Sequence, residues 1–302
     1  MKYIVFLITL CILLIPAPAA GLGRLAHQAV CEIAYQHLND NATAEVNRLL
    51  SFEKNERYNE FSNACAWADD KRGGRTDKRR NDHFVNFPRD LLKISNNQCL
   101  LNKRCIFSAI DEDLNTLANS KNNQEKLKAL KYLAHWIGDI HQPFHVSFQD
   151  DRGGNNIYLT SDSLCEKNLH AVWDRCLLEF YVKKNHLNTR IRKDRELFFE
   201  ILIASISDEQ AAAWTKNTSI VEWANESFDI VRAPEVIYCF NKDKACWYSN
   251  RDRYHIHRGK NKNSRKIVIS KEYLNQFDDL LILQIQKAGI RLSHLLNQTL
   301  GK

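Results

Sequence analysis

The sequence predicts an all-α fold: a single, mostly helical domain with minor β structure, stapled by disulfide bonds. Three observations support this expectation. Apolar residues recur at spacings of three and four along much of the chain, as in helices that pack one face on a core. Strand signals are few, and eight cysteines follow an N-terminal apolar segment. Because no Pro/Gly/Ser-rich linker, internal repeat or low-complexity tract divides the chain, we expect one domain.

The chain begins with a segment typical of a secretory signal peptide. Lys2 precedes a twelve-residue apolar run, and small residues follow up to Gly21. The run is too short to span a bilayer core of about 30 Å, so an uncleaved anchor is the less favoured alternative. We expect cleavage after Gly21, although cleavage after Ala19 also fits. This gives a signal peptide over residues 1–21, a domain over residues 22–302, and a secreted or periplasmic protein without stable membrane association.

Four segments show the helical pattern most clearly. We expect helices over residues 27–38, 127–140, 169–182 and 277–296. Pro143 should end or kink the second of these helices just past Gln142, because proline lacks the N–H that continues a helix. The main strand signal is residues 155–160, which follow Gly153-Gly154 and are compatible with a short β-hairpin.

The cysteines indicate a disulfide framework. Eight remain once the signal peptide with Cys11 is removed, and an even number in an exported chain favours four disulfide bonds. Three pairs are close enough in sequence to close small loops, which would leave Cys31 with Cys65, although other pairings are open. These three pairs are Cys99 with Cys105, Cys165 with Cys176, and Cys239 with Cys246.

Charge and glycosylation signals narrow the function only slightly. The formal net charge of +7 suits a polyanionic partner, but an ordinary basic secreted protein has the same balance. Four N-x-Ser/Thr sequons would carry glycans only in a eukaryotic secretory route. They begin at Asn41, Asn217, Asn225 and Asn297.

Histidines and aspartates recur at spacings that suit metal binding. His135 and Asp139 are four residues apart, so on a helix they lie on one face and can hold one ion together. His170 and Asp174 repeat this spacing, and His145 follows the proline that breaks the first helix. A single such pair is more often a surface hydrogen bond, but two pairs with further His and Asp residues favour a metal site.

The further residues are His27, Asp69 and His83, near three other short motifs. Imidazole and carboxylate donors without thiolates suit catalytic zinc. More than one ion is expected for phosphodiester hydrolysis, which needs both a nucleophile near neutral pH and neutralisation of the charged transition state. A carboxylate such as that of Asp139 has two oxygens and can bridge two ions.

Several of these motifs lie in segments that together span most of the expected mature chain. The segments are Leu22-Gly-Arg-Leu-Ala-His27, Trp67-Ala-Asp69, His83-Phe-Val-Asn86, the block from His135 to His145, Gly153-Gly154-Asn155, His170-x-x-x-Asp174, Trp223-Ala-Asn-Glu-Ser227 and Ala288-Gly-x-Arg-Leu292. In them the sequence resembles the S1/P1 nuclease family, zinc-dependent single-strand nucleases and 3′-nucleotidases related to bacterial zinc phospholipase C. The resemblance implies a helical fold of the phospholipase C/P1 nuclease type.

The resemblance also implies three zinc ions and their ligands. The first ion would be held by Asp69, His83, His135 and Asp139, and the second by His145, His170 and Asp174. The third would be held by His27, by Asp139 as a bridge, and by the amino nitrogen and carbonyl oxygen of Leu22. Relatives usually start with tryptophan, so Leu22 departs from the family pattern, and it can serve only if cleavage falls after Gly21.

On the substrate side, the resemblance gives Asp69, Arg72 and Asn155 catalytic roles. Arg72 would also contact phosphate, Phe84 would stack on a base, and Asn86 would hydrogen-bond that base. Stacking needs an unstacked base, which favours single strands over duplex. The expected substrates are therefore single-stranded DNA and RNA, cut to 5′-phosphate products, and 3′-nucleotides; the expected state is a monomer.

Two alternatives remain. A zinc phospholipase C would use nearly the same ligands on phospholipid head groups. Its relatives carry Glu where Asp174 stands and a longer gap before the first histidine, so Asp174 and the short step from Leu22 to His27 favour the nuclease. The second alternative is a zinc-binding or adhesion protein that has kept the fold without activity.

Overall fold

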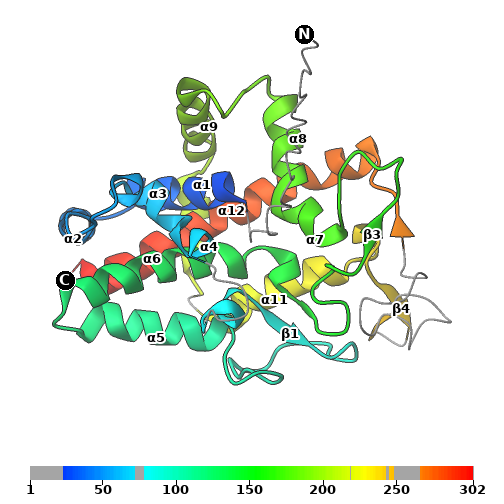
Figure 1. Cartoon of the computed structure of the whole chain (residues 1–302), viewed down its shortest axis with the longest axis horizontal. Coiled ribbons are helices and arrows are strands. Elements are labelled where there is room, and N and C mark those ends of the chain that lie inside the picture. Colours follow the sequence, from blue (N-terminus) through cyan, green and yellow to red (C-terminus); the bar gives the residue numbers. More distant parts are fainter. Residues whose placement is uncertain (1–22, 72–77, 218, 243–244, 248–265, 302) are drawn as a thin grey trace, which may run out of the picture.

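In the computed structural model, the described residues are 23–71, 78–217, 219–242, 245–247 and 266–301, and most of them are helical (Figure 1). The expected all-α class, with small sheets, is confirmed. In chain order the helices are α1 (Arg24–Gln36), α2 (Asp40–Leu50), α3 (Phe61–Cys65), α4 (Trp67–Asp70), α5 (Ile106–Asn119), α6 (Asn123–Ile140), α7 (Leu169–Ala171), α8 (Leu177–Lys184), α9 (Arg192–Ala204), α10 (Asp208–Thr215), α11 (Ile220–Arg232) and α12 (Lys271–Leu300).

Short turns and strands connect these helices. The 3-10 turns are η1 (Glu56–Tyr58), η3 (Arg80–His83), η4 (Pro143–His145) and η6 (Pro234–Val236), and η5 (Val172–Cys176) is a π-helical turn. The strands are β1 (Val85–Phe87), β2 (Val146–Phe148), β3 (Tyr158–Leu159), β4 (Phe240–Lys242), β5 (Ala245–Trp247) and β6 (Lys266–Ile267). They form two-stranded sheets in which β1 pairs with β2 and β3 with β6, both parallel, while β4 and β5 are antiparallel.

The hairpin expected over residues 155–160 is confirmed only in part. Tyr158 forms an isolated antiparallel bridge with Asn168, and the N–H of Leu159 donates to the Lys167 carbonyl at 3.2 Å. The regular strand at Tyr158 and Leu159, however, pairs in parallel with β6, about a hundred residues later. The described antiparallel ladder with two strands is that of β4 and β5.

Helices α6 and α12 form the centre of the fold. Helix α6 packs on α5, α1 and α2, while α12 runs along α1, α2, α6, α8 and α10. The approach of α12 to α1 is close at Gly289, where an added Cβ would lie 2.6 Å from the Ile33 side chain. The glycine therefore allows the helix that carries His27 to sit directly against the central helix.

Local chemistry sets the ends of α6. The Asn122 side chain caps its start by accepting hydrogen bonds from the backbone N–H groups of Gln124 and Glu125. The helix ends at Ile140, and Pro143 opens the following 3-10 turn η4. The sequence therefore predicted the break correctly, within two residues.

Four disulfides hold the helices and loops together: Cys31–Cys65, Cys99–Cys105, Cys165–Cys176 and Cys239–Cys246. This is the pairing favoured by sequence proximity. The first bond joins α1 to α3, and the third ties the π-helical turn to the loop before α7. Four disulfides are typical of proteins that fold in an oxidising compartment, as expected for an exported chain. The segment assigned to the signal peptide, residues 1–21, lies outside the described residues.

One sequon is closed to glycosylation by the fold. Asn225 is 5 % exposed, its side-chain amide donates to the carbonyl of Ile94, and its oxygen accepts from the Ile94 N–H. The same nitrogen also donates to the Val221 carbonyl, so a glycan would displace one of its two hydrogen bonds and would have to pass through a filled core; in the folded protein Asn225 is not an acceptor site. Within the described residues, none of the helices combines the length and the apolar character that a membrane span requires.

Candidate metal centre

The histidines and aspartates singled out in the sequence meet in the interior of the molecule. They come from elements far apart in the chain: α1, α4, η3, α6, η4, α7 and the π-helical turn η5. Asp69 is half-buried, and the rest are buried. Their ligand atoms form three groups compact enough to hold metal ions: His27 with Asp69 and His135, His83 with His135 and Asp139, and His145 with His170 and Asp174.

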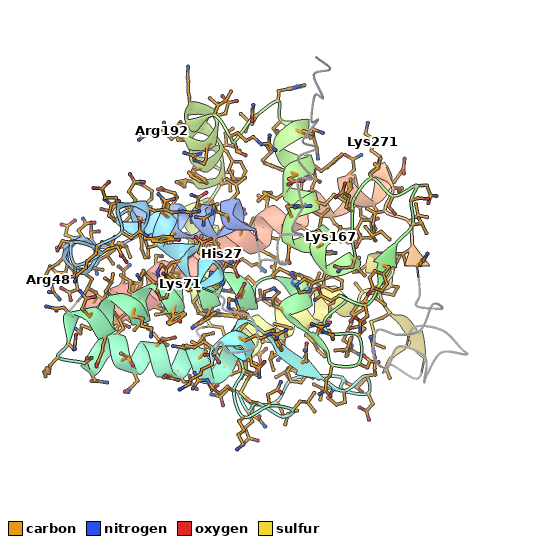
Figure 2. All side chains as sticks on the ribbon, viewed as in Figure 1. His27, Arg48, Lys71, Lys167, Arg192 and Lys271 are labelled. Carbon is orange, nitrogen blue, oxygen red and sulfur yellow. A yellow bond between two sulfur atoms is a disulfide. The ribbon has the colours of Figure 1, made fainter. Side chains whose placement is uncertain are left out.

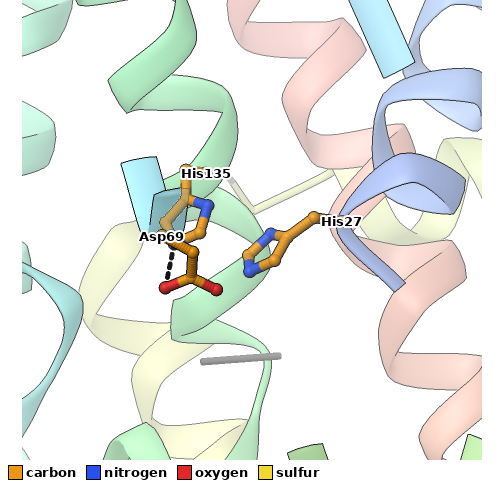
Figure 3. A group of neighbouring side chains, drawn as sticks. All are labelled: His27, Asp69 and His135. Carbon is orange, nitrogen blue, oxygen red and sulfur yellow. Dashed lines mark ion pairs between the residues drawn. The ribbon is translucent and has the colours of Figure 1, made fainter. Parts of the chain in front are cut away.

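The first group joins three separate helices (Figure 3). His27 projects from α1, Asp69 from α4 and His135 from α6. The rings of His27 and His135 stack with centroids 3.8 Å apart, and His135 Nε2 lies 3.6 Å from Asp69 Oδ1. Because Nε2 of His135 also belongs to the second group, the two groups are continuous.

Asp139 lies at the centre of this cluster. Its Oδ2 is 3.0 Å from His83 Nδ1 and 3.2 Å from His135 Nε2. Its Oδ1 faces the other way, 3.4 Å from His27 Nε2 and 3.3 Å from His145 Nδ1. The carboxylate thus presents its two oxygens to different histidines, as a bridging ligand would.

The third group is built around Asp174, with His145 and His170 stacked beside it. The two rings lie 5.1 Å apart, His170 Nε2 is 3.2 Å from Asp174 Oδ2, and His145 Nε2 is 3.7 Å from Asp174 Oδ1. The helix widens into a π-helical turn between His170 and Asp174, a feature common at functional sites. The predicted four-residue spacing still brings the pair together.

Hydrogen bonds to backbone carbonyls fix the orientation of three of these rings. A carbonyl oxygen can only accept, so each Nδ1 carries the hydrogen and, in the neutral ring, Nε2 keeps a lone pair directed into the cluster. Metal-binding histidines are typically held in this way. The acceptors are the carbonyls of Cys65 for His135, His83 for His145 and Gly153 for His170, at 2.7, 2.6 and 2.7 Å.

The electrostatics of the cluster suit a cation. Burial lowers the pKa of His27 and of His145, which favours the neutral form that binds metals. Burial opposes charge on His135 as well, but the negative charges of Asp139 and Asp69 raise its pKa to about 9. In the metal-free protein, the carboxylates of Asp139 and Asp69 therefore favour a protonated, positively charged His135. A bound metal cation would supply that positive charge instead.

Unsatisfied polar atoms test whether the residues fit metal ions. Within the described part of the chain, both ring nitrogens of His27, Oδ1 of Asp139 and Oδ2 of Asp174 are buried without a hydrogen-bond partner. Leaving such atoms unpaired costs about 1–3 kcal/mol each. A metal ion coordinated by these lone pairs removes that cost, so the donor set fits nitrogen- and oxygen-binding metals such as zinc.

The start of the described chain lies against this centre. The N–H of Gly23 donates to the carbonyl oxygen of Asp174 at 2.8 Å. An added Cβ on Gly23 would lie 3.0 Å from the same oxygen. The residue that follows Leu22 is therefore anchored to a residue of the third group, while Leu22 itself lies outside the described residues.

The residues expected to contact substrate are only partly described. Phe84, half-buried, directly follows His83, and the buried Oδ1 of Asn86 on β1 has no hydrogen-bond partner among the described residues. Asn155 is half-buried and donates its amide to the carbonyl of Arg152 at 2.9 Å. Arg72 lies outside the described residues.

The S1/P1 Nuclease family model matches residues 22–301. The chain belongs to the S1/P1 nuclease family. Endonuclease 4 of Arabidopsis thaliana is 25% identical over 292 residues, 91% of this chain and 88% of the relative. Nuclease P1 of Penicillium citrinum is 24% identical over 295 residues, 92% and 98% of the two chains, and Nuclease S1 of Aspergillus oryzae is 31% identical over 158 residues, 51% and 53%. The protein is thus an endonuclease-type hydrolase with a nucleic acid substrate.

In this S1/P1 nuclease, the Gly153-Gly154 turn shapes the third group. Both glycines have positive φ, 62° and 77°. An added Cβ would lie 2.6 Å from the Phe144 carbonyl oxygen at Gly153 and 2.7 Å from the Phe144 ring at Gly154. The turn therefore packs tightly against η4, and this packing brings the Gly153 carbonyl within hydrogen-bond distance of His170 Nδ1.

A buried network under this turn escaped the sequence analysis. Asp151 accepts hydrogen bonds from the Gly154 N–H at 2.9 Å, from the Tyr238 hydroxyl at 2.7 Å and from the Arg89 guanidinium at 2.7 Å. Arg89 and Tyr238 come from distant parts of the chain and fall in no motif. Their sequence carried no signal, because the network exists only once β1 and the segment after η6 pack together.

Gln142 is another residue whose role the sequence did not reveal. It is fully buried between Pro143 and the end of α6, its amide donates to Asp174 Oδ1, and its oxygen accepts from the Phe144 N–H. It therefore orients a carboxylate of the third group. Its place inside the block from His135 to His145 was the only available hint.

We expect Gln142→Leu to weaken zinc binding about 10- to 100-fold, as is typical when a hydrogen bond to a metal-binding residue is lost. Competition with a fluorescent chelator measures the affinity. Gln286→Leu is the matched control, because Gln286 is also buried but donates to Leu202 and Ser205 instead. Equal affinities in the two variants would show that Gln142 does not position Asp174.

Proposed function

We propose that this protein is a zinc-dependent endonuclease that hydrolyses phosphodiester bonds of single-stranded DNA and RNA to 5′-phosphate products, and that it removes phosphate from 3′-nucleotides. The observation that carries the proposal is the set of three buried His/Asp groups with rings oriented by backbone carbonyls. The proposed side-chain ligands are His27, Asp69, His83, His135, Asp139, His145, His170 and Asp174.

Zinc bound by these residues would supply a nucleophile near neutral pH and neutralise the charge that develops on phosphorus oxygens. The chain's own contribution is to hold the ligands in place. The carbonyls of Cys65, His83 and Gly153 keep three rings in the metal-binding tautomer, and burial keeps His27 and His145 neutral. Because the ligands come ready oriented, little rearrangement opposes binding or catalysis.

We propose that Leu22 becomes the first residue and adds its amino nitrogen and carbonyl oxygen to the site. The anchoring of Gly23 to the Asp174 carbonyl supports this, since it holds the residue that follows Leu22 against the His/Asp cluster. The proposal requires a signal peptide of residues 1–21 and export as a mature chain of residues 22–302. We further propose that this mature chain acts as a monomer. N-terminal sequencing that finds a start at Ala20 would exclude this role of Leu22.

We propose that Phe84 stacks on a base of the substrate and that Asn86 hydrogen-bonds the same base. The placement of Asn86 supports this, because it follows Phe84 by two residues along an extended segment, so both side chains leave the backbone on the same side. Base stacking on an aromatic ring contributes about 1–3 kcal/mol and is available only when the base is unstacked. Arg72 and Asn155 are proposed to contact the phosphate, with Asp69 supporting the chemistry as a ligand.

Parallel assays test the proposal against the phospholipase alternative. The mature protein is expected to cleave single-stranded DNA and RNA, to leave 5′-phosphates, and to act much more slowly on phosphatidylcholine. Activity should be lost in chelator and restored by zinc, because the donor set is rich in imidazole nitrogen. Turnover of the lipid alone would exclude the nuclease proposal, and a zinc-loaded protein inactive on both substrates would indicate a non-catalytic role.

A further inference from the structure

A pocket of ≈ 370 Å³ lies outside the metal centre, between the loop after α2, the short helix α4 and the first half of α6. Its lining is basic and partly aromatic. Four lysines and one glutamate face it, together with an indole ring. These residues are Lys54, Lys71, Lys128, Lys131, Glu53 and Trp67.

The positive charge of this pocket is largely uncompensated. Lys131 is 4 % exposed and forms an ion pair with Glu53. Among the described residues, no carboxylate pairs with Lys54, Lys71 or Lys128. In the described part of the chain, these three cations therefore line the pocket without a carboxylate partner. Burial lowers the pKa of Lys131 and the ion pair with Glu53 opposes this, while the positive charges of Lys71 and Lys128 lower the pKa further, a repulsion that an additional anion would relieve.

The walls of the pocket are held in place before any ligand arrives. The Nζ of Lys131 lies 4.0 Å from the ring centroid of Trp67, and that ring meets Tyr132 edge-on at 5.0 Å. The loop after α2 is tied to α6 by a hydrogen bond of 3.2 Å from the Gln124 amide to the Phe52 carbonyl. Lys128 and Lys131 therefore lie on a packed helix, and the loop that carries Lys54 is held against that helix.

The pocket and the metal centre share two helices. Trp67 precedes Asp69 by two residues on α4, and Lys131 precedes His135 by one turn of α6, about 6 Å along the helix axis. Figure 2 labels Lys71, just past the end of α4, and His27 on α1. The pocket and the metal centre are therefore connected through α4 and α6, and on α6 they are one helical turn apart.

We propose that this pocket binds a backbone phosphate of a single-stranded nucleic acid, adjacent to the phosphodiester that is cut. The inference rests on the proposed function, because it takes the substrate strand as the ligand. Lysine ammonium groups bind phosphate as point charges, without selecting a base. The pocket therefore adds affinity for long strands that is independent of sequence, beyond what the metal centre supplies.

The test compares a long oligothymidylate with a thymidine dinucleotide in wild-type enzyme and a Lys54→Ala/Lys128→Ala variant. The single phosphate of the dinucleotide must lie at the metal centre, so no phosphate remains for the pocket. We expect the variant to raise the KM for the long strand on the order of fivefold. The slope of log(kcat/KM) against log salt should become shallower by about 0.7, because the pocket neutralises one phosphate of the strand. Kinetics on the dinucleotide should not change.

The matched control is Lys193→Ala/Lys216→Ala, which removes two exposed lysines on α9 and at the end of α10. It lowers the net charge equally and should leave the salt slope at the wild-type value. Both double variants change exposed side chains only, and their melting temperatures verify that folding is intact.

Three outcomes would overturn the inference. Wild-type cleavage of both substrates with equal KM changes in the two double variants would assign the effect to net charge alone. Loss of binding to phosphatidylserine vesicles with unchanged strand kinetics would assign the pocket to a lipid surface. A zinc-loaded wild-type enzyme that cleaves neither substrate would remove the proposed function itself, a result distinct from the other two.

Discussion

Replacing Asp139 with asparagine is expected to reduce kcat on single-stranded DNA about a thousandfold or more, and to lower the zinc content of the purified protein. Asp139 is approached within 3.0–3.4 Å by four histidines, two at each carboxylate oxygen. The amide keeps the shape but loses the charge and one coordinating oxygen. Metal ions contribute several kcal/mol to transition-state stabilisation, and about 4 kcal/mol corresponds to the stated factor.

Activity and zinc content should be measured on the same preparations, with Asp278→Asn as control. Asp278 is also a fully buried carboxylate, but it pairs with Lys184 and belongs to none of the three His/Asp groups. The control is expected to lose some stability and to keep its zinc and its activity. An Asp139→Asn enzyme with full zinc content and wild-type kcat would show that this carboxylate does not bridge ions.

How much of this site could be predicted depends on how local its determinants are. His135 and Asp139 lie on one helix face because the period of the helix alone decides it, and their spacing was read correctly. The same holds for the end of α6, where the proline next to Gln142 acts through its own backbone. Such features require no knowledge of the tertiary structure.

Other parts of the site depend on packing between distant segments. His27 and Asp69 meet His135 only because Gly289 lets α1 approach α12 and because the Cys31–Cys65 disulfide holds α3 near α1. The sequence alone showed neither contact. The sequence singled out His27 and Asp69 as candidates by residue type, and the family resemblance alone assigned them to particular ions.

The hairpin expected over residues 155–160, which forms only as an isolated bridge, shows a different limit. A Gly-Gly pair before a short apolar stretch is a turn signal, but the signal does not say what the turn packs against. Here both glycines are needed because Phe144 occupies the space that a side chain at either position would fill. The turn also positions the Gly153 carbonyl to accept a hydrogen bond from His170. The partner of β3 is β6, which local sequence has no means to indicate.

Removing the metals is expected to lower the melting temperature by about 15 °C or more. An ion that binds only the folded state stabilises it by about 4 kcal/mol at a thousandfold excess over its Kd. Two such ions, of the three expected, give about 8 kcal/mol. In chains of this size the melting temperature changes by roughly 2 °C per kcal/mol of unfolding free energy. The buried, unpaired atoms of His27, Asp139 and Asp174 explain why the folded protein depends on the ions. Calorimetry with and without a chelator measures the shift.

Restoration distinguishes specific loss of zinc from a general effect of the chelator. Zinc should return the melting temperature to its starting value, and magnesium should not, because magnesium prefers oxygen ligands in octahedral geometry. In Asp139→Asn the chelator should produce a smaller shift. An unchanged melting temperature in a protein verified to be metal-free would show that the His/Asp groups are stable without ions.

The pH dependence of this shift follows from His135. In the metal-free protein its pKa is raised to about 9 by Asp139 and Asp69, against burial, from an ordinary value of 6.5. Because the pKa of His135 is higher in the folded than in the unfolded chain, protonation of this residue stabilises the metal-free fold. That contribution is complete below pH 6.5 and is lost as the pH rises through about 9. Protons also compete with zinc for the same nitrogen, so zinc binds more tightly at the higher pH. Both effects have the same sign, and chelation should therefore destabilise the protein more at pH 9 than at pH 6.5.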